Sequence, residues 1–66
     1  MQLTAAQTFN RADLIWHDAL VDVFGKAAGD ARYTDAGKGD AGTALRAAYD
    51  NRTAARVEWE ATRAAA

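Results

Sequence analysis

The sequence has no cysteine, serine or proline, and only one histidine. Without cysteine the chain has no disulfide, no thiolate zinc site and no thiol nucleophile. Without serine it also lacks the hydroxyl nucleophile most used in hydrolases. His17 and Asp13, four residues apart, could offer two metal ligands from one helical face, but a third ligand would have to come from Glu60 or from another subunit. The sequence therefore predicts neither an enzyme nor a metal or cofactor site.

Excess charge and long apolar runs are also absent. The formal net charge is -1, which gives no general attraction to nucleic acid or to an anionic membrane. Asp13, Asp18 and Asp22 interrupt the most apolar segment, so no membrane span is predicted. The stretch Met1 to Ala6 has no basic region followed by an apolar one, as a signal peptide would. We expect a cytoplasmic protein, or one incorporated into an assembly formed in the cytoplasm.

The chain is short, with 66 residues. A domain of this size buries only about 60% of the surface that its unfolded chain exposes, so its stability is marginal. Small domains often compensate with disulfides, metals or oligomerisation. Since cysteine is absent, oligomerisation or a protein partner is the expected source of further stability.

Two helices and a Gly-rich connection account for the whole sequence. A helix over about 5–24 begins at the capping-box pattern Thr4-Ala5-Ala6-Gln7, with Asn10 as an alternative N-cap, and ends at Gly25. A second helix covers about 42–64, capped by Asp40 or Thr43. Residues 25–41 are predicted to form a loop, in which a helical turn around 26–31 is compatible with the sequence.

This pattern predicts an all-α fold: an antiparallel two-helix hairpin with a Gly-rich loop, completed by oligomerisation or by a partner. The antiparallel register places Phe9 beside Trp59 and Leu20 beside Ala48. Asp13 lies within the apolar arc of the first helix, where a charge needs a partner. The same register offers Arg52 or Arg56, so we expect a charge pair between Asp13 and one of these two arginines.

The first helix has more large apolar side chains than one partner helix can cover. At about 100° per residue they form a main arc, with Leu14 and Val21 outside it. The arc consists of Phe9, Ala12, Ile15, Trp16, Ala19, Leu20, Val23 and Phe24. The second helix carries a stripe of small residues, Ala41, Ala48 and Ala55, beside Leu45 and Trp59. The predicted interface residues are Leu14, Val21, Phe24, Trp16 and Trp59.

Two further patterns are compatible with ligand binding. Residues 37–42 match the phosphate-binding pattern GxGxxG, but the strand that must precede it is missing, which leaves weak anion capture with Lys38 as the open alternative. Arg52, Arg56 and Arg63 lie near Tyr49 and Trp59, a combination found on nucleic-acid-binding surfaces. The same arginines could instead be satisfied within the chain, over the tryptophans and on Glu60.

The length and the order of helix, Gly-rich connection and helix resemble small phage head-tail joining proteins, although those carry a β-hairpin. The resemblance implies an assembly role, for example in a phage particle. From the residues we expect a non-catalytic structural or protein-interaction subunit that binds itself, as a dimer or higher oligomer, or a larger protein assembly. The alternatives are a small inhibitor, such as an antitoxin or a phage-encoded antagonist, and a weak nucleic-acid-binding protein.

Overall fold

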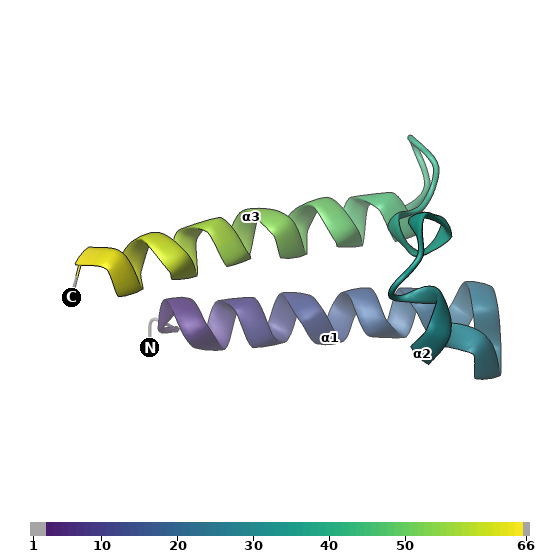
Figure 1. Ribbon diagram of the computed structural model, residues 1–66, viewed down its shortest axis with the longest axis horizontal. Coiled ribbons are helices and arrows are strands. Elements are labelled where there is room, and N and C mark those ends of the chain that lie inside the picture. Colours follow the sequence, from purple (N-terminus) through teal and green to yellow (C-terminus); the bar gives the residue numbers. More distant parts are fainter. Residues whose placement is uncertain (1–2, 66) are drawn as a thin grey trace.

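The computed structural model describes residues 3–65 and shows two long helices packed side by side in antiparallel order (Figure 1). Helix α1 spans Ala5–Phe24 and helix α3 spans Ala44–Ala65. The chain between them forms the 3₁₀ turn η1 (Gly25–Ala27), the short helix α2 (Ala28–Ala31) and the 3₁₀ turn η2 (Asp35–Lys38). The described residues contain no strand, and the predicted all-α helical hairpin is confirmed.

Local hydrogen bonds explain where α1 begins and ends. The backbone N–H of Gln7 donates to Thr4 Oγ1 (3.1 Å), and the N–H of Thr4 donates to Gln7 Oε1 (2.9 Å). This reciprocal capping box satisfies two backbone donors that the helix itself leaves unpaired. At the other end Gly25 has a φ of 58°, and its N–H donates to the carbonyl of Val21. Asn10, the alternative cap, lies inside the helix.

Helix α3 begins two residues later than the sequence indicates. The side chain of Thr43 caps it, since the N–H of Arg46 donates to Thr43 Oγ1 (3.2 Å). Asp40 has a different role, because its backbone carbonyl accepts the hydroxyl of Thr43 (2.7 Å). Gly42 has a φ of 86°, which a right-handed helix does not allow, so the helix starts only after it.

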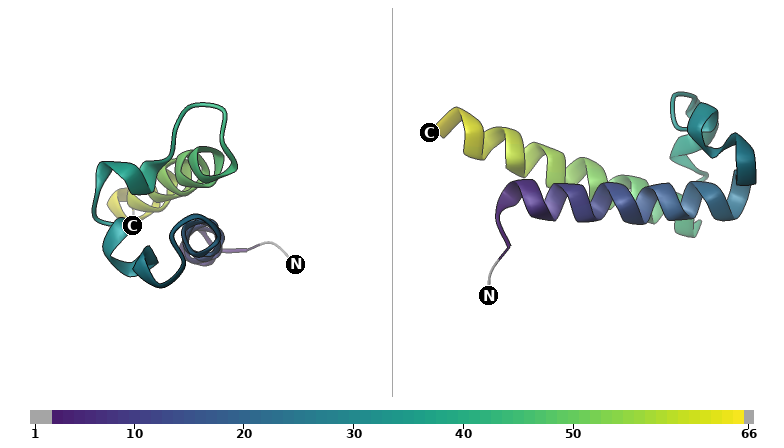
Figure 2. Two further views of the ribbon diagram at one scale, coloured as in Figure 1. Left: turned by 90° about the vertical axis from the view of Figure 1, so that its right-hand side faces the viewer. Right: turned by 90° about the horizontal axis from the view of Figure 1, so that it is seen from below.

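The connection is more ordered than the predicted loop. It lies to one side of the α1–α3 pair, at one end of the hairpin (Figure 2). Ala28 and Ala31 of α2 are buried together with Trp16 and Leu20 of α1. The sequence allowed a helical turn here, and in the structure that turn forms part of the core.

The core is narrow because small residues dominate it. Of the hydrophobic residues that the structure describes, eight are buried, and five of these are alanines. The buried set is Ala12, Trp16, Leu20, Ala28, Ala31, Leu45, Ala48 and Ala55. Ala48 and Ala55 belong to the small-residue stripe of the second helix, and their size lets α1 approach α3 closely.

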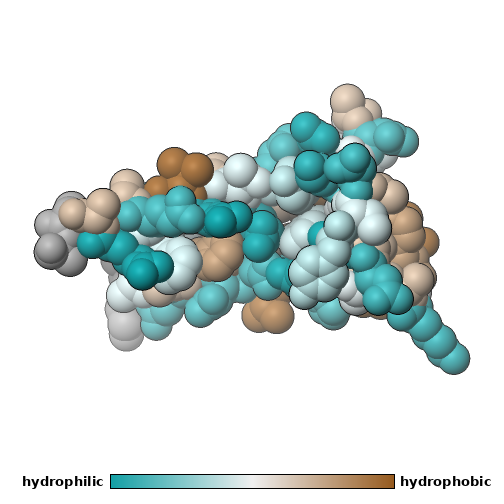
Figure 3. All heavy atoms as spheres, viewed as in Figure 1, coloured by the Kyte–Doolittle hydropathy of each residue, from teal (hydrophilic) through white to brown (hydrophobic). Residues whose placement is uncertain are grey.

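Some of the predicted core is exposed. Ile15 and Val23 were assigned to the main apolar arc, but both side chains are more than half exposed. Ile15 points about 100° away from Trp16 around the helix, so it lies at the edge of the arc. Val23 lies in the middle of the arc, but it borders a second hollow of about 280 Å³ between the end of α1, the connection and the start of α3. On the face of the molecule seen in Figure 3, the hydrophobic surface forms several small separate patches rather than one continuous patch.

Gly37 provides a direct test of how closely the connection packs. A Cβ atom at Gly37 would lie 2.2 Å from the carbonyl oxygen of Ala31, and at this distance the backbone must shift. We expect Gly37→Ala to lower the free energy of unfolding by about 1–3 kcal/mol in urea denaturation, as overpacking commonly does.

Gly29→Ala is the matched control, because a Cβ atom at Gly29 meets nothing within 4 Å. This second variant should be neutral or more stable by up to about 1 kcal/mol, since alanine restricts the unfolded chain. Equal unfolding midpoints for the two variants would contradict the close packing of η2 on α2.

Candidate functional site

One aspartate joins three segments of the chain. Oδ1 of Asp13 in α1 accepts a hydrogen bond from Arg32 Nη2 (2.6 Å) and another from Arg52 Nε (2.7 Å). Arg32 directly follows α2, and Arg52 lies in α3. A single carboxylate therefore connects α1, α3 and the segment between them, 19 and 39 residues away in sequence.

The two arginines hold this carboxylate in its charged form. Partial burial acts to raise the pKa of Asp13, but the hydrogen bonds and positive charges of Arg52 and Arg32 outweigh that effect, so the pKa lies below its ordinary value. The group of three carries a net charge of +1 when all its members are ionised, because two guanidinium groups share one carboxylate.

Trp16 lies at the centre of the same group. The guanidinium carbons of Arg32 and Arg52 are each 4.9 Å from the centroid of its ring, within the range of cation–π interactions. Its indole N–H donates to the carbonyl of Gly37 (3.0 Å), and Tyr49 packs edge-on at 5.5 Å. The buried indole thus has its polar atom satisfied and fixes η2 over the hairpin.

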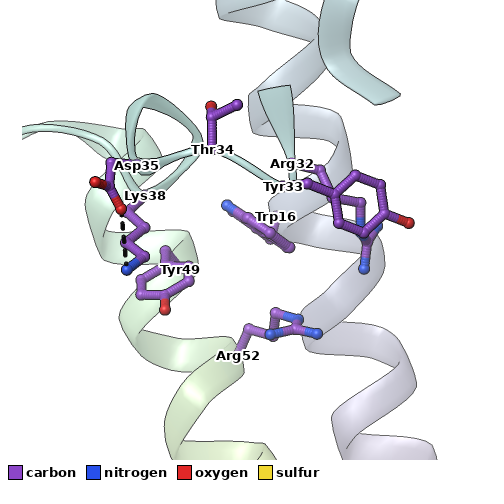
Figure 4. A pocket seen from close by; sticks show the side chains of 8 residues that line it. All are labelled: Trp16, Arg32, Tyr33, Thr34, Asp35, Lys38, Tyr49 and Arg52. Carbon is purple, nitrogen blue, oxygen red and sulfur yellow. Dashed lines mark ion pairs between the residues drawn. The ribbon is translucent and has the colours of Figure 1, made fainter. Parts of the chain in front are cut away.

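A hollow of about 270 Å³ opens beside this cluster. Figure 4 shows Trp16 between α1 and α3, with Lys38 and Tyr49 on one side, and Arg32 and Tyr33 on the other. Arg52 reaches from α3 toward α1, and Lys38 forms a 3.5 Å ion pair with the fully exposed Asp35. The complete lining consists of Trp16, Arg32, Tyr33, Thr34, Asp35, Lys38, Tyr49 and Arg52.

The structure separates the two candidate partners of Asp13. Arg52 contacts it directly, whereas Arg56 donates from Nε to Glu60 Oε1 (3.0 Å), one turn further along α3. Arg32, which the sequence did not select, supplies the second contact. In the sequence, Arg32 stands out only as part of Arg32-Tyr33-Thr34, a short strand-like run within the Gly-rich connection.

The predicted interface residues have different surroundings. Leu14 and Val21 are 63% and 44% exposed, and they form the external patch of α1. Trp16 is only 3% exposed and belongs to the core of the chain itself. Phe24 and Trp59 are half-buried: Phe24 packs against the core, and Trp59 stacks on Phe9 at 5.3 Å.

Residues of the other two sequence patterns make contacts within the chain. The N–H groups of Gly37 and Gly39 donate to the carbonyls of Thr34 (3.1 Å) and Ala36 (3.3 Å), so these amides of the GxGxxG segment are used within the turn. On α3, Arg63 lies over Trp59, with its guanidinium carbon 5.0 Å from the ring centroid. With Arg56 on Glu60 and Arg52 on Asp13, each arginine of the cluster has an intramolecular partner.

Residues 3–65 contain no group of three or more His, Asp or Glu side chains that could hold a metal ion. Over the same range, no helix combines the length and the apolar character needed to cross a lipid bilayer. Comparisons with protein-family models, with curated proteins and with solved structures each found no match.

Asp13→Asn tests the importance of the shared carboxylate. Because hydrogen bonds to charged groups contribute about 1.5–3 kcal/mol each, we expect this variant to lose about 1–3 kcal/mol of unfolding free energy at pH 7. The lowered pKa means that this contribution is complete above the ordinary aspartate value of about 3.9 and is lost as the pH falls through the folded-state value. The difference from the parent chain should therefore shrink in strong acid.

Asp18→Asn is the control, because Asp18 is exposed on the same helix and has no ion pair within residues 3–65. Urea denaturation from about pH 7 down to 2.5 measures both variants. A stability difference for Asp13→Asn that stayed constant over this range would contradict the role of the ionised carboxylate.

Proposed function

We propose that this chain is a non-catalytic assembly subunit that buries the outer face of α1 against another protein. The simplest arrangement is a dimer in which two hairpins form a four-helix bundle; docking on a larger assembly is the other form of the same role. The chain would act in the cytoplasm or within an assembly formed there.

The observation that carries this proposal is the exposed patch of Leu14 and Val21 on a chain with a narrow core. These two residues are seven apart and share one face of α1, directed away from α3. Phe24 continues the same line three residues later and is only half-buried. The spacing is typical of residues that form a seam between packed helices.

Energetics also favours a partner. Among the residues that the structure describes, three large side chains are buried: Trp16, Leu20 and Leu45. Burying one such side chain contributes about 1.5–3 kcal/mol. A partner that covered Leu14 and Val21 would add burial of similar size per residue and require little further ordering of α1.

The nucleic-acid alternative receives less support. The arginines that suggested it are held by Asp13, by Glu60 and over Trp59 within the chain. To bind a phosphate backbone, Arg56 and Arg63 would have to leave Glu60 and Trp59. The net protein charge of -1 provides no long-range attraction that would compensate. A small inhibitor would use the same face of α1, so the mass of the purified chain separates that role from self-assembly.

Substitution of the patch by lysine tests the proposal. Lysine is a good helix former, and at position 14 it lies four residues before Asp18, so Leu14→Lys with Val21→Lys should preserve α1. We expect sedimentation of the parent chain to show a dimer or larger oligomer, and the double variant to dissociate at least about 10-fold more readily.

Val57→Lys is the matched control, because Val57 is equally exposed but lies on α3, outside the patch. Its sedimentation should match that of the parent chain. If the parent chain is monomeric and thermally robust at the same concentrations, self-assembly is excluded; if the double variant keeps the parent mass, the α1 patch is not the interface.

A further inference from the structure

The hollow beside Trp16 is bordered by more positive than negative charge. Arg32, Arg52 and Lys38 contribute three cations, while Asp13 and Asp35 contribute two anions. Asp35 is fully exposed and pairs with Lys38 at 3.5 Å, a geometry in which water screens most of the attraction. The hollow therefore keeps a local charge of +1.

The two guanidinium groups retain unused donors. Among residues 3–65, Arg32 donates one side-chain hydrogen bond through Nη2 and Arg52 donates one through Nε, both to the same oxygen of Asp13. A guanidinium group has five N–H donors, so most of those on each arginine remain available. The side chains are 24% and 18% exposed, which places these donors at the boundary between protein and solvent.

These donors are also held in position before any ligand arrives. Asp13 fixes one edge of each guanidinium group, and the Trp16 ring fixes one face of each. Long side chains commonly lose about 0.5–1.5 kcal/mol of conformational entropy when binding immobilises them. The side chains of Arg32 and Arg52 are already ordered in the folded chain. An anion would therefore bind them at a smaller entropic cost than it would bind two mobile arginines.

Size and charge together select the class of ligand. Small-molecule sites commonly enclose about 300–1,000 Å³, and this hollow of about 270 Å³ lies just below that range, so a single side chain suits it better than a nucleotide. A charge of +1 matches a carboxylate, which forms two parallel hydrogen bonds with a guanidinium group. Tyr33, 85% exposed at the edge of the hollow, adds the aromatic surface that protein-binding sites favour.

We propose that the hollow formed by Arg32, Arg52, Lys38 and Tyr33 binds a carboxylate side chain, Asp or Glu, of a partner protein. This assignment rests on the proposed role as a protein-binding subunit and adds the chemistry of one contact. The partner segment is acidic, and its carboxylate takes the donors of Arg32 and Arg52 that Asp13 leaves free, with Lys38 opposite them.

The test uses a peptide of defined chemistry. The intact chain is titrated with N-acetyl-Gly-Glu-Gly-amide at constant ionic strength while NMR follows the side-chain N–H signals of Arg32, Arg52 and Trp16. We expect shifts that saturate with a dissociation constant of about 1–20 mM, the range for one charged contact. The corresponding glutamine peptide should shift none of these signals.

Variants identify the binding residues. Arg32→Gln should weaken binding about 10-fold, since it removes one of the two guanidinium groups. Because Arg32 also contacts Asp13 and Trp16, Lys38→Gln is the second variant; its side chain is about half exposed, and we expect binding to weaken about 2- to 5-fold. Arg56→Gln removes a cation outside the hollow and should leave binding unchanged.

Three results would overturn the assignment: no saturable shift at Arg32 and Arg52 up to about 50 mM peptide, equal shifts with the glutamine peptide, or binding of inorganic phosphate without binding of the glutamate peptide. The titration is repeated on the Leu14→Lys, Val21→Lys double variant. Binding that persists in a monomer supports the hollow even if self-assembly fails, so the two proposals are tested separately.

Discussion

The shared carboxylate of Asp13 is the interaction on which the rest of this structure depends. It receives one guanidinium group from α3 and one from the end of α2, and both groups lie on the ring of Trp16. The ring in turn donates its N–H to Gly37 and so fixes the second half of the connection. One polar cluster thereby links α1, the connection and α3, as a larger hydrophobic core does in bigger domains.

Such a cluster contributes more to the selection of one folded arrangement than to the free energy of unfolding. Transferring charges out of water costs free energy, and apolar residues of the same volume often stabilise a fold equally well. Apolar contacts among alanines are nearly interchangeable, however, so α3 could slide along α1 by one turn with little loss. The polar contacts are less interchangeable, because a slide by one turn would replace Arg52 at Asp13 by Arg56 and would separate Arg56 from Glu60. We therefore assign to this group the role of fixing the helix register.

The sequence predicted those parts of the fold that depend on neighbours in the chain. The capping box at Thr4, the stop at Gly25 and the all-α hairpin follow from local patterns, and the antiparallel register brought Phe9 to Trp59 and Asp13 to Arg52. It did not predict the path of the connection. That path depends on a hydrogen bond between Trp16 and Gly37, 21 residues apart, and on a contact too close for any side chain at Gly37. Neither of these two contacts produces a periodic pattern in the sequence. The position of Arg32 beside Asp13 could therefore not be predicted.

The same reasoning explains why the outer surface of α1 was easier to find than the hollow. Helical periodicity fixes the direction of each side chain, so Leu14 and Val21 were separated from the core by counting alone. The hollow is formed by residues from three segments that meet only after folding, and its main cations lie 20 residues apart in sequence. The register-fixing cluster and the candidate carboxylate site share Arg32 and Arg52. A partner that binds there would therefore contact the very groups that set the register of the hairpin, and its binding would favour the folded register over any other.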